Sequence, residues 1–401
     1  MSAGDSSTGS PPRILIIHTD GNTFNNPTLK CVIDLLLEKG CEVDLRYPRS
    51  NAPMPAPRGV RLLPFGRIAR HLKANVFDRL ASRRLAALCV SAERLALYRK
   101  YDLLIGVDRQ GLIEAGILHR LTGTPYVFFS FEIMFESETS ARYKALEREA
   151  ATAASMWLVQ DEARARQLEI ENGLQPGNRF LLPLASAGPG ALGTRRLRDQ
   201  LRVPEAMKVA IAIGSVEGWS MTGRILKSVA GWPEDWALIV HERYGRTRER
   251  LRAELAPVGH LVGRRIFLSD DAPDLVDDLG TVLAGVSAGL AFYEPDFKGP
   301  YSGRNLQHLG MASGKISTYL RYGVPVILND IGLYPGEARR FGFGRVVESP
   351  EQIAGQLDAC REERCGSSAR SYFLEKLDFN VHVHGLWSRL RDAMAAGGSR
   401  R

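Results

Sequence analysis

The chain contains two successive series of short apolar runs that alternate with amphipathic segments of helical periodicity. The first series begins with RILIIHT at 13–19, which is followed by a polar turn and the helical pattern PTLKCVIDLLLEKG. The pattern restarts with KVAIAIG at 208–214, again followed by a glycine-containing turn and a helical segment. Strands that alternate with helices form parallel sheets, because each connection between parallel strands must cross over the sheet. The restart therefore predicts an α/β protein with two Rossmann-like, doubly wound lobes that face a cleft.

The expected domains follow from these patterns and from the loops between them. A chain of 401 residues is long enough for two domains. We expect a disordered leader at 1–12, an N-terminal lobe at 13–188, a C-terminal lobe at 189–378, and a C-terminal helix and tail at 379–401. The loop-like segment between Gly188 and Gly193 marks the lobe boundary. Further strands are expected in CEVDLRYP, YDLLIGVD, TPYVFFSFE, MWLVQ, WALIVHE, RIFLSD, AGLAFYE, VPVILND and GRVVES.

Cysteine usage and apolar run length indicate the compartment. The cysteines are scattered, odd in number and without the paired spacings of a metal site or a disulfide framework. This pattern predicts free thiols in a reducing cytoplasm and no structural metal. No stretch approaches the roughly 20 apolar residues of a membrane-spanning helix, so any membrane contact is expected to be peripheral, on the inner face of the plasma membrane.

The segment Arg61–Lys100 is strongly basic, with Asp78 and Glu93 as its only acidic residues. Apolar and cationic residues interleave in it, as in a surface helix that rests on anionic lipid. The alternative is a helix that packs on the core and leaves a solvated arginine face. No nucleic-acid-binding signature accompanies the charge, so we expect no nucleic-acid partner.

The strongest chemical signal is GMASGKISTYLRYGVPVILND at 310–330. A polar turn with Lys315 opens a helix, Gly323 ends it, and VPVILN returns as a strand. Turn amides, the positive helix N-terminus and one lysine together form a site for a diphosphate. The alternative is an ordinary helix on which Lys315 is solvated.

This segment resembles the donor-binding segment of GT-B glycosyltransferases, in the large retaining family that includes bacterial polysaccharide and lipopolysaccharide transferases. The matching residues are Lys315, Ile316, Tyr319, Gly323, Pro325, Val326 and Ile327. The flanking blocks AGLAFYEP and GLYPGEARRFGFGRVVESPEQIAGQL also resemble the family. The resemblance implies a hexosyltransferase that moves a sugar from a nucleotide-diphosphate sugar to a sugar or lipid-linked acceptor in surface polysaccharide or glycoconjugate synthesis, without metal or cofactor.

The chain departs from this family at two places. Retaining members commonly carry two glutamates separated by seven residues, and Gly310 and Thr318 stand at these positions. Thr318 can hydrogen-bond a ribose hydroxyl but cannot act as a charged acceptor. The resemblance therefore implies retention, while the missing glutamates leave inversion open.

The candidate donor-binding residues come from several turns that the fold would bring to the cleft. In the first lobe, the turn after 13–19 contributes Gly21 and Asn22. The second lobe contributes Gly214, Ser215, Arg243, Arg304, Asn305, Ser313, Gly314 and Thr318. For Ser215 and Arg243, a flexible turn and a solvated surface side chain are the alternative interpretations.

Lys315, Asp108 and Glu132 are the candidate catalytic residues. Asp108 and Glu132 follow predicted strands, and SFEIMF resembles a family run in which Glu132 is kept and Phe131 replaces a histidine. A carboxylate at a cleft edge can deprotonate an acceptor hydroxyl, orient the sugar, or cap the following helix. Two rival functions stay open: a nucleotide-sugar epimerase of the same architecture, and a noncatalytic binding subunit.

Overall fold

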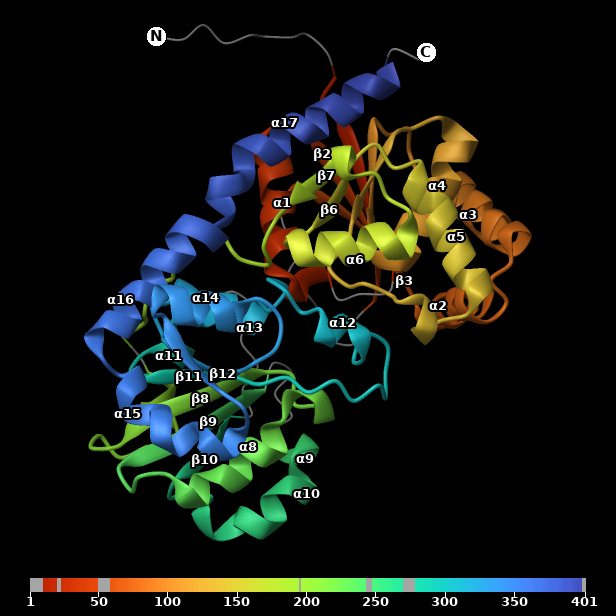
Figure 1. The fold of residues 1–401 in the computed structure, drawn as a ribbon. Coiled ribbons are helices and arrows are strands. Elements are labelled where there is room, and N and C mark those ends of the chain that lie inside the picture. Colours follow the sequence, from red (N-terminus) through yellow and green to blue (C-terminus); the bar gives the residue numbers. More distant parts are fainter. Residues whose placement is uncertain are drawn as a thin grey trace, which may run out of the picture.

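Two parallel sheets form two separate lobes, which Figure 1 shows one above the other. The computed structural model describes residues 10–19, 23–49, 58–194, 196–242, 247–269 and 278–398. Most of the expected leader at 1–12 lies outside these ranges. Within them, the strand order β3-β2-β1-β4-β5-β6-β7 in the first lobe matches β10-β9-β8-β11-β12-β13 in the second. This repetition confirms the predicted architecture of two Rossmann-like lobes.

The strands of the first lobe are β1 (Arg13–Ile17), β2 (Glu42–Pro48), β3 (Val60–Phe65), β4 (Leu103–Val107), β5 (Tyr126–Phe129), β6 (Trp157–Val159) and β7 (Arg179–Leu181). Its helices are α1 (Pro27–Glu38), α2 (Arg67–Ala74), α3 (Arg83–Leu97), α4 (Asp108–Thr122), α5 (Ala141–Thr152) and α6 (Glu162–Asn172). Neither β3 nor β7 was predicted. β3 occupies the start of the basic segment and contains Pro64, which an edge strand tolerates because it need not donate to a neighbour.

The strands of the second lobe are β8 (Lys208–Gly214), β9 (Trp236–Glu242), β10 (Ile266–Ser269), β11 (Ala288–Ala291), β12 (Val326–Asn329) and β13 (Gly344–Val347). The helices after β7 are α7 (Leu197–Gln200), α8 (Thr222–Ser228), α9 (Thr247–Arg250), α10 (Arg252–Leu255), α11 (Gly280–Leu283), α12 (Arg304–Gln307), α13 (Gly314–Arg321), α14 (Tyr334–Phe341), α15 (Leu357–Cys360), α16 (Glu363–Tyr372) and α17 (Phe379–Gly398).

Both faces of the first sheet are buried, which explains why β1 is apolar from Ile14 to Ile17. Ile14 and Ile16 belong to one core cluster, and Leu15 and Ile17 belong to another. Because successive side chains of a strand point to opposite faces, each cluster covers one face of the sheet. The first of these clusters includes Leu386 of α17, so the chain returns from the second lobe to the first, where Figure 1 shows α17 lying along it.

A buried arginine joins the two lobes. Arg164 of α6 is fully buried, and its guanidinium donates to the carbonyl oxygens of His308 and Phe131, each at 2.9 Å. It also donates to Asn305 Oδ1 at 3.2 Å. Burial lowers the pKa of Arg164, whereas the carboxylates of Glu132, Asp161 and Asp108 oppose this shift. The second-lobe segment from Asn305 to His308 is thus held directly against the first lobe.

Asp161 strengthens the same contact from the N-terminus of α6. Its Oδ1 caps α6 by accepting hydrogen bonds from the amides of Ala163 and Arg164, at 2.9 and 3.0 Å. Its Oδ2 accepts the amide of Met311, in the second lobe, at 2.7 Å. A single carboxylate therefore starts a helix in one lobe and binds the backbone of the other.

Replacement of Arg164 by methionine tests this contact. Arg164→Met leaves several buried oxygens without their donor, so we expect the free energy of unfolding to fall by about 3 kcal/mol. Urea and thermal unfolding measure the change. Arg166→Met is the matched control, because Arg166 is exposed on the same helix and should change stability by less than about 0.5 kcal/mol. Equal melting of the two variants would mean that the contact does not stabilise the protein.

Candidate active site

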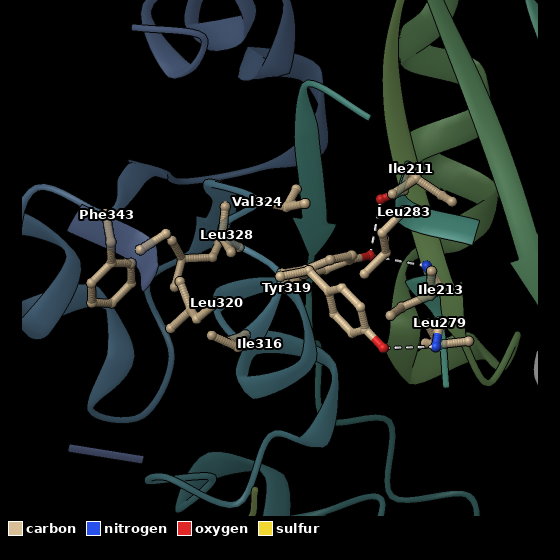
Figure 2. Packing of buried hydrophobic residues seen from close by; sticks show 14 of the residues in the cluster. Ile211, Ile213, Leu279, Leu283, Ile316, Tyr319, Leu320, Val324, Leu328 and Phe343 are labelled. Carbon is tan, nitrogen blue, oxygen red and sulfur yellow. Dashed lines mark hydrogen bonds between the residues drawn. The ribbon is translucent and has the colours of Figure 1, made fainter. Parts of the chain in front are cut away.

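The helix α13, which carries Lys315, is anchored to the second sheet by Tyr319. Figure 2 shows this buried ring reaching the strand β8, where the phenol oxygen accepts the amide of Ile213 at 3.0 Å and donates to the carbonyl of Ile211 at 2.9 Å. Ser313 caps the helix by accepting the amide of Ile316 at 3.1 Å. The hydrogen bonds of Tyr319 thus fix the position of the helix N-terminus relative to the end of β8.

Lys315 extends from this N-terminus across the end of β8. Its Cε lies 3.5 Å from the place where a Cβ on Gly214 would be. Gly214 has φ of 98°, a backbone conformation that favours glycine. The ammonium lies 5.3 Å from the centre of the Tyr293 ring, and the phenol of Tyr293 hydrogen-bonds Ser313 Oγ at 2.5 Å. The lysine is therefore held near the helix N-terminus by its contacts with Gly214 and the Tyr293 ring.

A cavity of about 410 Å³ lies between the lobes and includes this lysine. The first lobe contributes residues that follow β1, β4 and β5, and the second contributes residues at the carboxyl ends of β8 and β9 and after β11. The carboxyl ends of strands where the strand order reverses are the usual ligand site of such sheets. The candidates that line the cavity are Asp108, Glu132, Gly214, Ser215, Asn305, Ser313, Gly314, Lys315 and Thr318.

Asp108 holds the loop after β5 and does not cap its own helix. It is the first residue of α4 and has φ of 53°, a strained conformation for a residue with a side chain. Its Oδ1 accepts the amides of Phe131 and Glu132 at 2.8 and 3.0 Å. The helix-capping alternative is wrong, since the carboxylate binds amides of another segment and α4 has no side-chain cap.

Glu132 reaches toward the second lobe. Its Oε2 accepts a hydrogen bond from Nδ2 of Asn305, whose Oδ1 accepts the amide of Ile133 at 2.9 Å. Asn305 is therefore hydrogen-bonded to two adjacent residues of the loop after β5 as well as to Arg164. This arrangement joins the two candidates Glu132 and Asn305 in one network that crosses the cleft.

Of the remaining four candidates, the structure places only Arg304. Gly21, Asn22 and Arg243 lie outside the described residues. Arg304 lies against the first lobe, because its guanidinium stacks 4.5 Å from the centre of the Phe135 ring and donates to Ser137 Oγ at 3.4 Å. Its backbone amide also donates to Glu138 Oε1, at 2.8 Å. The structure thus places Arg304 in the contact between the lobes and away from the cavity lining.

Several cavity residues were missed by sequence reasoning. Trp219 and Tyr293 form a stacked pair with ring centres 6.0 Å apart and planes inclined by 6°. His18 and His241 also line the cavity and are buried. Both histidines lie at the carboxyl ends of strands, so the strand-end rule that selected Asp108 would also have selected them. Nothing in the local pattern indicates the aromatic stack.

The position of the first missing glutamate has no room for a side chain. Gly310 has φ of 54°, and a Cβ built on it would lie 2.0 Å from Asp161 Oδ2 and 2.9 Å from Arg164 Cδ. The carboxylate that binds the lobes together thus occupies the space beside Gly310. Thr318, at the second glutamate position, is half-buried and lines the cavity.

The described residues offer no obvious metal site. Among them, no three or more His, Cys, Asp and Glu side chains gather as metal ligands would. The polar groups of the cavity are instead hydroxyls, amides, two histidines, two carboxylates and Lys315. Such a set can bind an anionic group near Lys315 and sugar hydroxyls elsewhere.

Two Rossmann-like lobes with a cavity between the carboxyl ends of their strands define the GT-B fold. HepE of Anabaena, in complex with UDP and glucose, has this fold with a TM-score of 0.68 at 14% identity, over 95% of this chain and 100% of that chain. Sucrose-phosphate synthase from Thermosynechococcus elongatus matches with a TM-score of 0.69 at 13% identity, over 96% and 100%. WaaG, a glycosyltransferase involved in lipopolysaccharide biosynthesis, matches with a TM-score of 0.60 at 14% identity, over 90% of this chain and 95% of that chain. No family model and no curated protein matches the chain.

Restoring the missing glutamates tests this description of the site. Gly310→Glu should destabilise the protein by about 3 kcal/mol or more, because the new Cβ would collide with Asp161 and the residue would adopt a strained φ. Thr318→Glu is the control, since it places the same side chain in the cavity and should preserve the melting temperature within a few degrees. Thermal unfolding distinguishes them, and a Gly310→Glu variant as stable as the wild type would contradict the observed packing.

Proposed function

We propose that this chain is a glycosyltransferase that moves a hexosyl group from a nucleotide-diphosphate sugar to a sugar or lipid-linked acceptor. The observation that carries the proposal is the position of Lys315 at the N-terminus of α13, inside the cavity between the lobes. HepE, which has the same fold, binds UDP-glucose in its solved complex. The acceptor would belong to surface polysaccharide or glycoconjugate synthesis.

The donor diphosphate would lie against the N-terminus of α13. The free amides of a helix N-terminus and the helix dipole favour an anion there. Negative charge on the diphosphate increases as the bond to the sugar breaks, so the Lys315 ammonium would stabilise the transition state more than the bound donor. The stacked Trp219 and Tyr293 would shape the wall beside it.

The stereochemistry of the transfer depends on which lobe supplies a carboxylate to the cavity. Retention is what the family resemblance implies. On the donor side, however, Gly310 and Thr318 supply no carboxylate, and the described carboxylates of the cavity, Asp108 and Glu132, both belong to the first lobe. A carboxylate facing the acceptor is suited to remove its proton.

The rival functions would act differently on the same donor. An epimerase would convert the donor sugar without an acceptor, and a binding subunit would bind the donor without releasing the nucleotide diphosphate. Two carboxylates at the cavity favour a catalytic site over a binding subunit, because a carboxylate there can remove the proton of an acceptor hydroxyl, which binding alone does not require.

The Lys315→Ala variant tests the proposed donor site. We expect kcat to fall about a hundredfold, which corresponds to about 3 kcal/mol of lost transition-state stabilisation, with weaker donor binding. Lys315→Arg should restore little activity, because a planar guanidinium cannot replace a compact ammonium beside Gly214. Transfer is measured with UDP-glucose and other nucleotide-diphosphate hexoses. Lys227→Ala, an exposed lysine on α8, is the control, and unchanged transfer by Lys315→Ala would remove Lys315 from the mechanism.

We also propose that the surface of α2 and α3 binds anionic membrane. Among the described residues, no helix is both long and apolar enough to span a bilayer, so the contact would be peripheral. Ile68 and Leu72 lie four residues apart on α2, and Leu88 and Leu95 lie seven apart on α3, so each pair shares a helix face. These side chains are exposed, Ile68 to 87% and Leu95 to 83%.

Only part of the basic charge in this segment is available to lipid. Arg61 and Arg99 bind the buried carboxylate of Asp44. Burial raises the pKa of Asp44, but hydrogen bonds from these two arginines outweigh burial and lower the pKa to about 2. Lys73 is buried and pairs with Glu114 at 2.6 Å. Other cations of the segment are exposed, among them Arg70, Arg84 and Arg94. Their charge and the apolar side chains together suit the anionic inner face of the plasma membrane.

Vesicle binding tests the membrane proposal. The double variant Ile68→Ser/Leu72→Ser should lower the partition coefficient onto anionic vesicles at least tenfold, because burial of each side chain contributes about 1.5–3 kcal/mol. Binding should also weaken as salt increases. Ile170→Ser is the control, since Ile170 is 72% exposed on α6, outside the proposed surface. Flotation with anionic and neutral vesicles measures both, and equal binding to the two would contradict the proposal.

A further inference from the structure

Two buried polar residues of the first lobe lie together at the wall of the cavity. His18 follows β1 and Asp108 follows β4, which are neighbouring strands of the sheet. Their side chains are 3.4 Å apart, from His18 Nε2 to Asp108 Oδ2. The residues are only 3% and 5% exposed, respectively. Because both line the cavity, they form a polar pair that faces the ligand space from the acceptor lobe.

The backbone fixes the position of the Asp108 side chain. Its φ of 53° is kept although it is strained for a residue with a side chain. Two amides bind Oδ1, at 2.8 and 3.0 Å, which leaves Oδ2 as the oxygen directed at His18. The carboxylate is thus held by one oxygen while the other faces the histidine.

Thr23 lies against the other ring nitrogen of His18. His18 Nδ1 lies 3.0 Å from Thr23 Oγ1. When the hydroxyl donates to Nδ1, the ring carries its proton on Nε2 and directs it at Asp108 Oδ2. The 3.4 Å separation is longer than a hydrogen bond, and such contacts often shorten when the substrate binds. The chain Thr23, His18, Asp108 therefore orients the reactive carboxylate oxygen.

We propose that Asp108 is the base that deprotonates the acceptor hydroxyl and that His18 is the positioning residue that orients its Oδ2. This inference rests on the proposed glycosyltransferase function. The acceptor oxygen would form a bond to the anomeric carbon and pass its proton to Asp108 Oδ2. At the same time the bond from that carbon to the diphosphate oxygen would break, and its electron pair would leave with the diphosphate beside Lys315.

Glu132 is the other carboxylate of the cavity and is less suited to this step. Its Oε2 already accepts a hydrogen bond from Asn305 within the network between the lobes. Protonating Glu132 would weaken a contact between the lobes, whereas Asp108 Oδ2 faces His18 of its own lobe, so a proton on Oδ2 leaves the contact between the lobes intact.

The proposal has a stereochemical consequence. The base belongs to the first lobe and the cation beside the leaving group belongs to the second. In a direct displacement, an acceptor activated by Asp108 attacks the anomeric carbon from the side opposite to the leaving diphosphate. Such a displacement inverts the configuration, so the product should have the anomer opposite to that of the donor.

Two variants and one product analysis test the proposal. Asp108→Asn should fold, because asparagine tolerates a positive φ and its amide oxygen can still accept the loop amides. We expect its kcat to fall at least a hundredfold while the donor KM stays within about threefold, as for loss of a general base. His18→Gln should lower kcat about tenfold, with the donor KM likewise kept. Proton NMR of the wild-type product gives the anomeric configuration.

The outcomes separate this inference from the proposed function. Wild-type transfer with inversion, together with the two kcat losses, would support it. Transfer by Asp108→Asn at the wild-type rate, or a wild-type product that retains the donor configuration, would overturn it and leave the glycosyltransferase function standing. If UDP-glucose and the other nucleotide-diphosphate hexoses give no transfer with the wild type, the proposed function fails and this inference fails with it. Azide is a nucleophile that needs no base. If Asp108→Ala forms the inverted glycosyl azide from the donor and added azide but forms no glycoside, this result would give further support.

Discussion

The buried contact of Arg164 and Asp161 with the segment from Asn305 to Met311 determines how the two lobes face each other. A buried guanidinium is costly unless hydrogen-bond acceptors and carboxylates lie near it. Here the partners come from both lobes, so the contact forms only when the lobes adopt this arrangement. The cavity, and the approach of first-lobe carboxylates to Lys315, depend on it.

The segment that resembles the donor site serves two purposes. Most of its matching residues, such as Ile316, Tyr319 and Val326, are buried in the core of the second lobe and stabilise it. Lys315 alone among them reaches the cavity. A match to such a motif therefore predicts the fold more directly than the reaction. The chemistry must be argued from the few side chains that the core leaves facing the ligand.

Charge has different uses on the two sides of the first lobe. In the segment from Arg61 to Lys100, several cations are neutralised by internal carboxylates, which attach β3, α2 and the residues after α3 to the rest of the lobe. The exposed apolar residues of α2 and α3 are not explained by packing. At the carboxyl ends of β4 and β5, Asp108 and Glu132 face the cavity, where a proton acceptor is useful. Net charge by itself would not have distinguished these three roles.

Local patterns in the chain were enough to predict the alternation of strands and helices, the two lobes, and the placement of Lys315 at a helix N-terminus. These features depend on residues close together in the chain, whose periodicity and capping are local properties. The sequence by itself could not locate β3 or β7, whose short runs carry no clear period. Only the tertiary structure decided that Gly310 must lack a side chain, that Arg304 contacts the first lobe, and that His18 meets Asp108. Each of these depends on side chains that are brought together across a long stretch of chain, and their directions are set by the packing of the lobes.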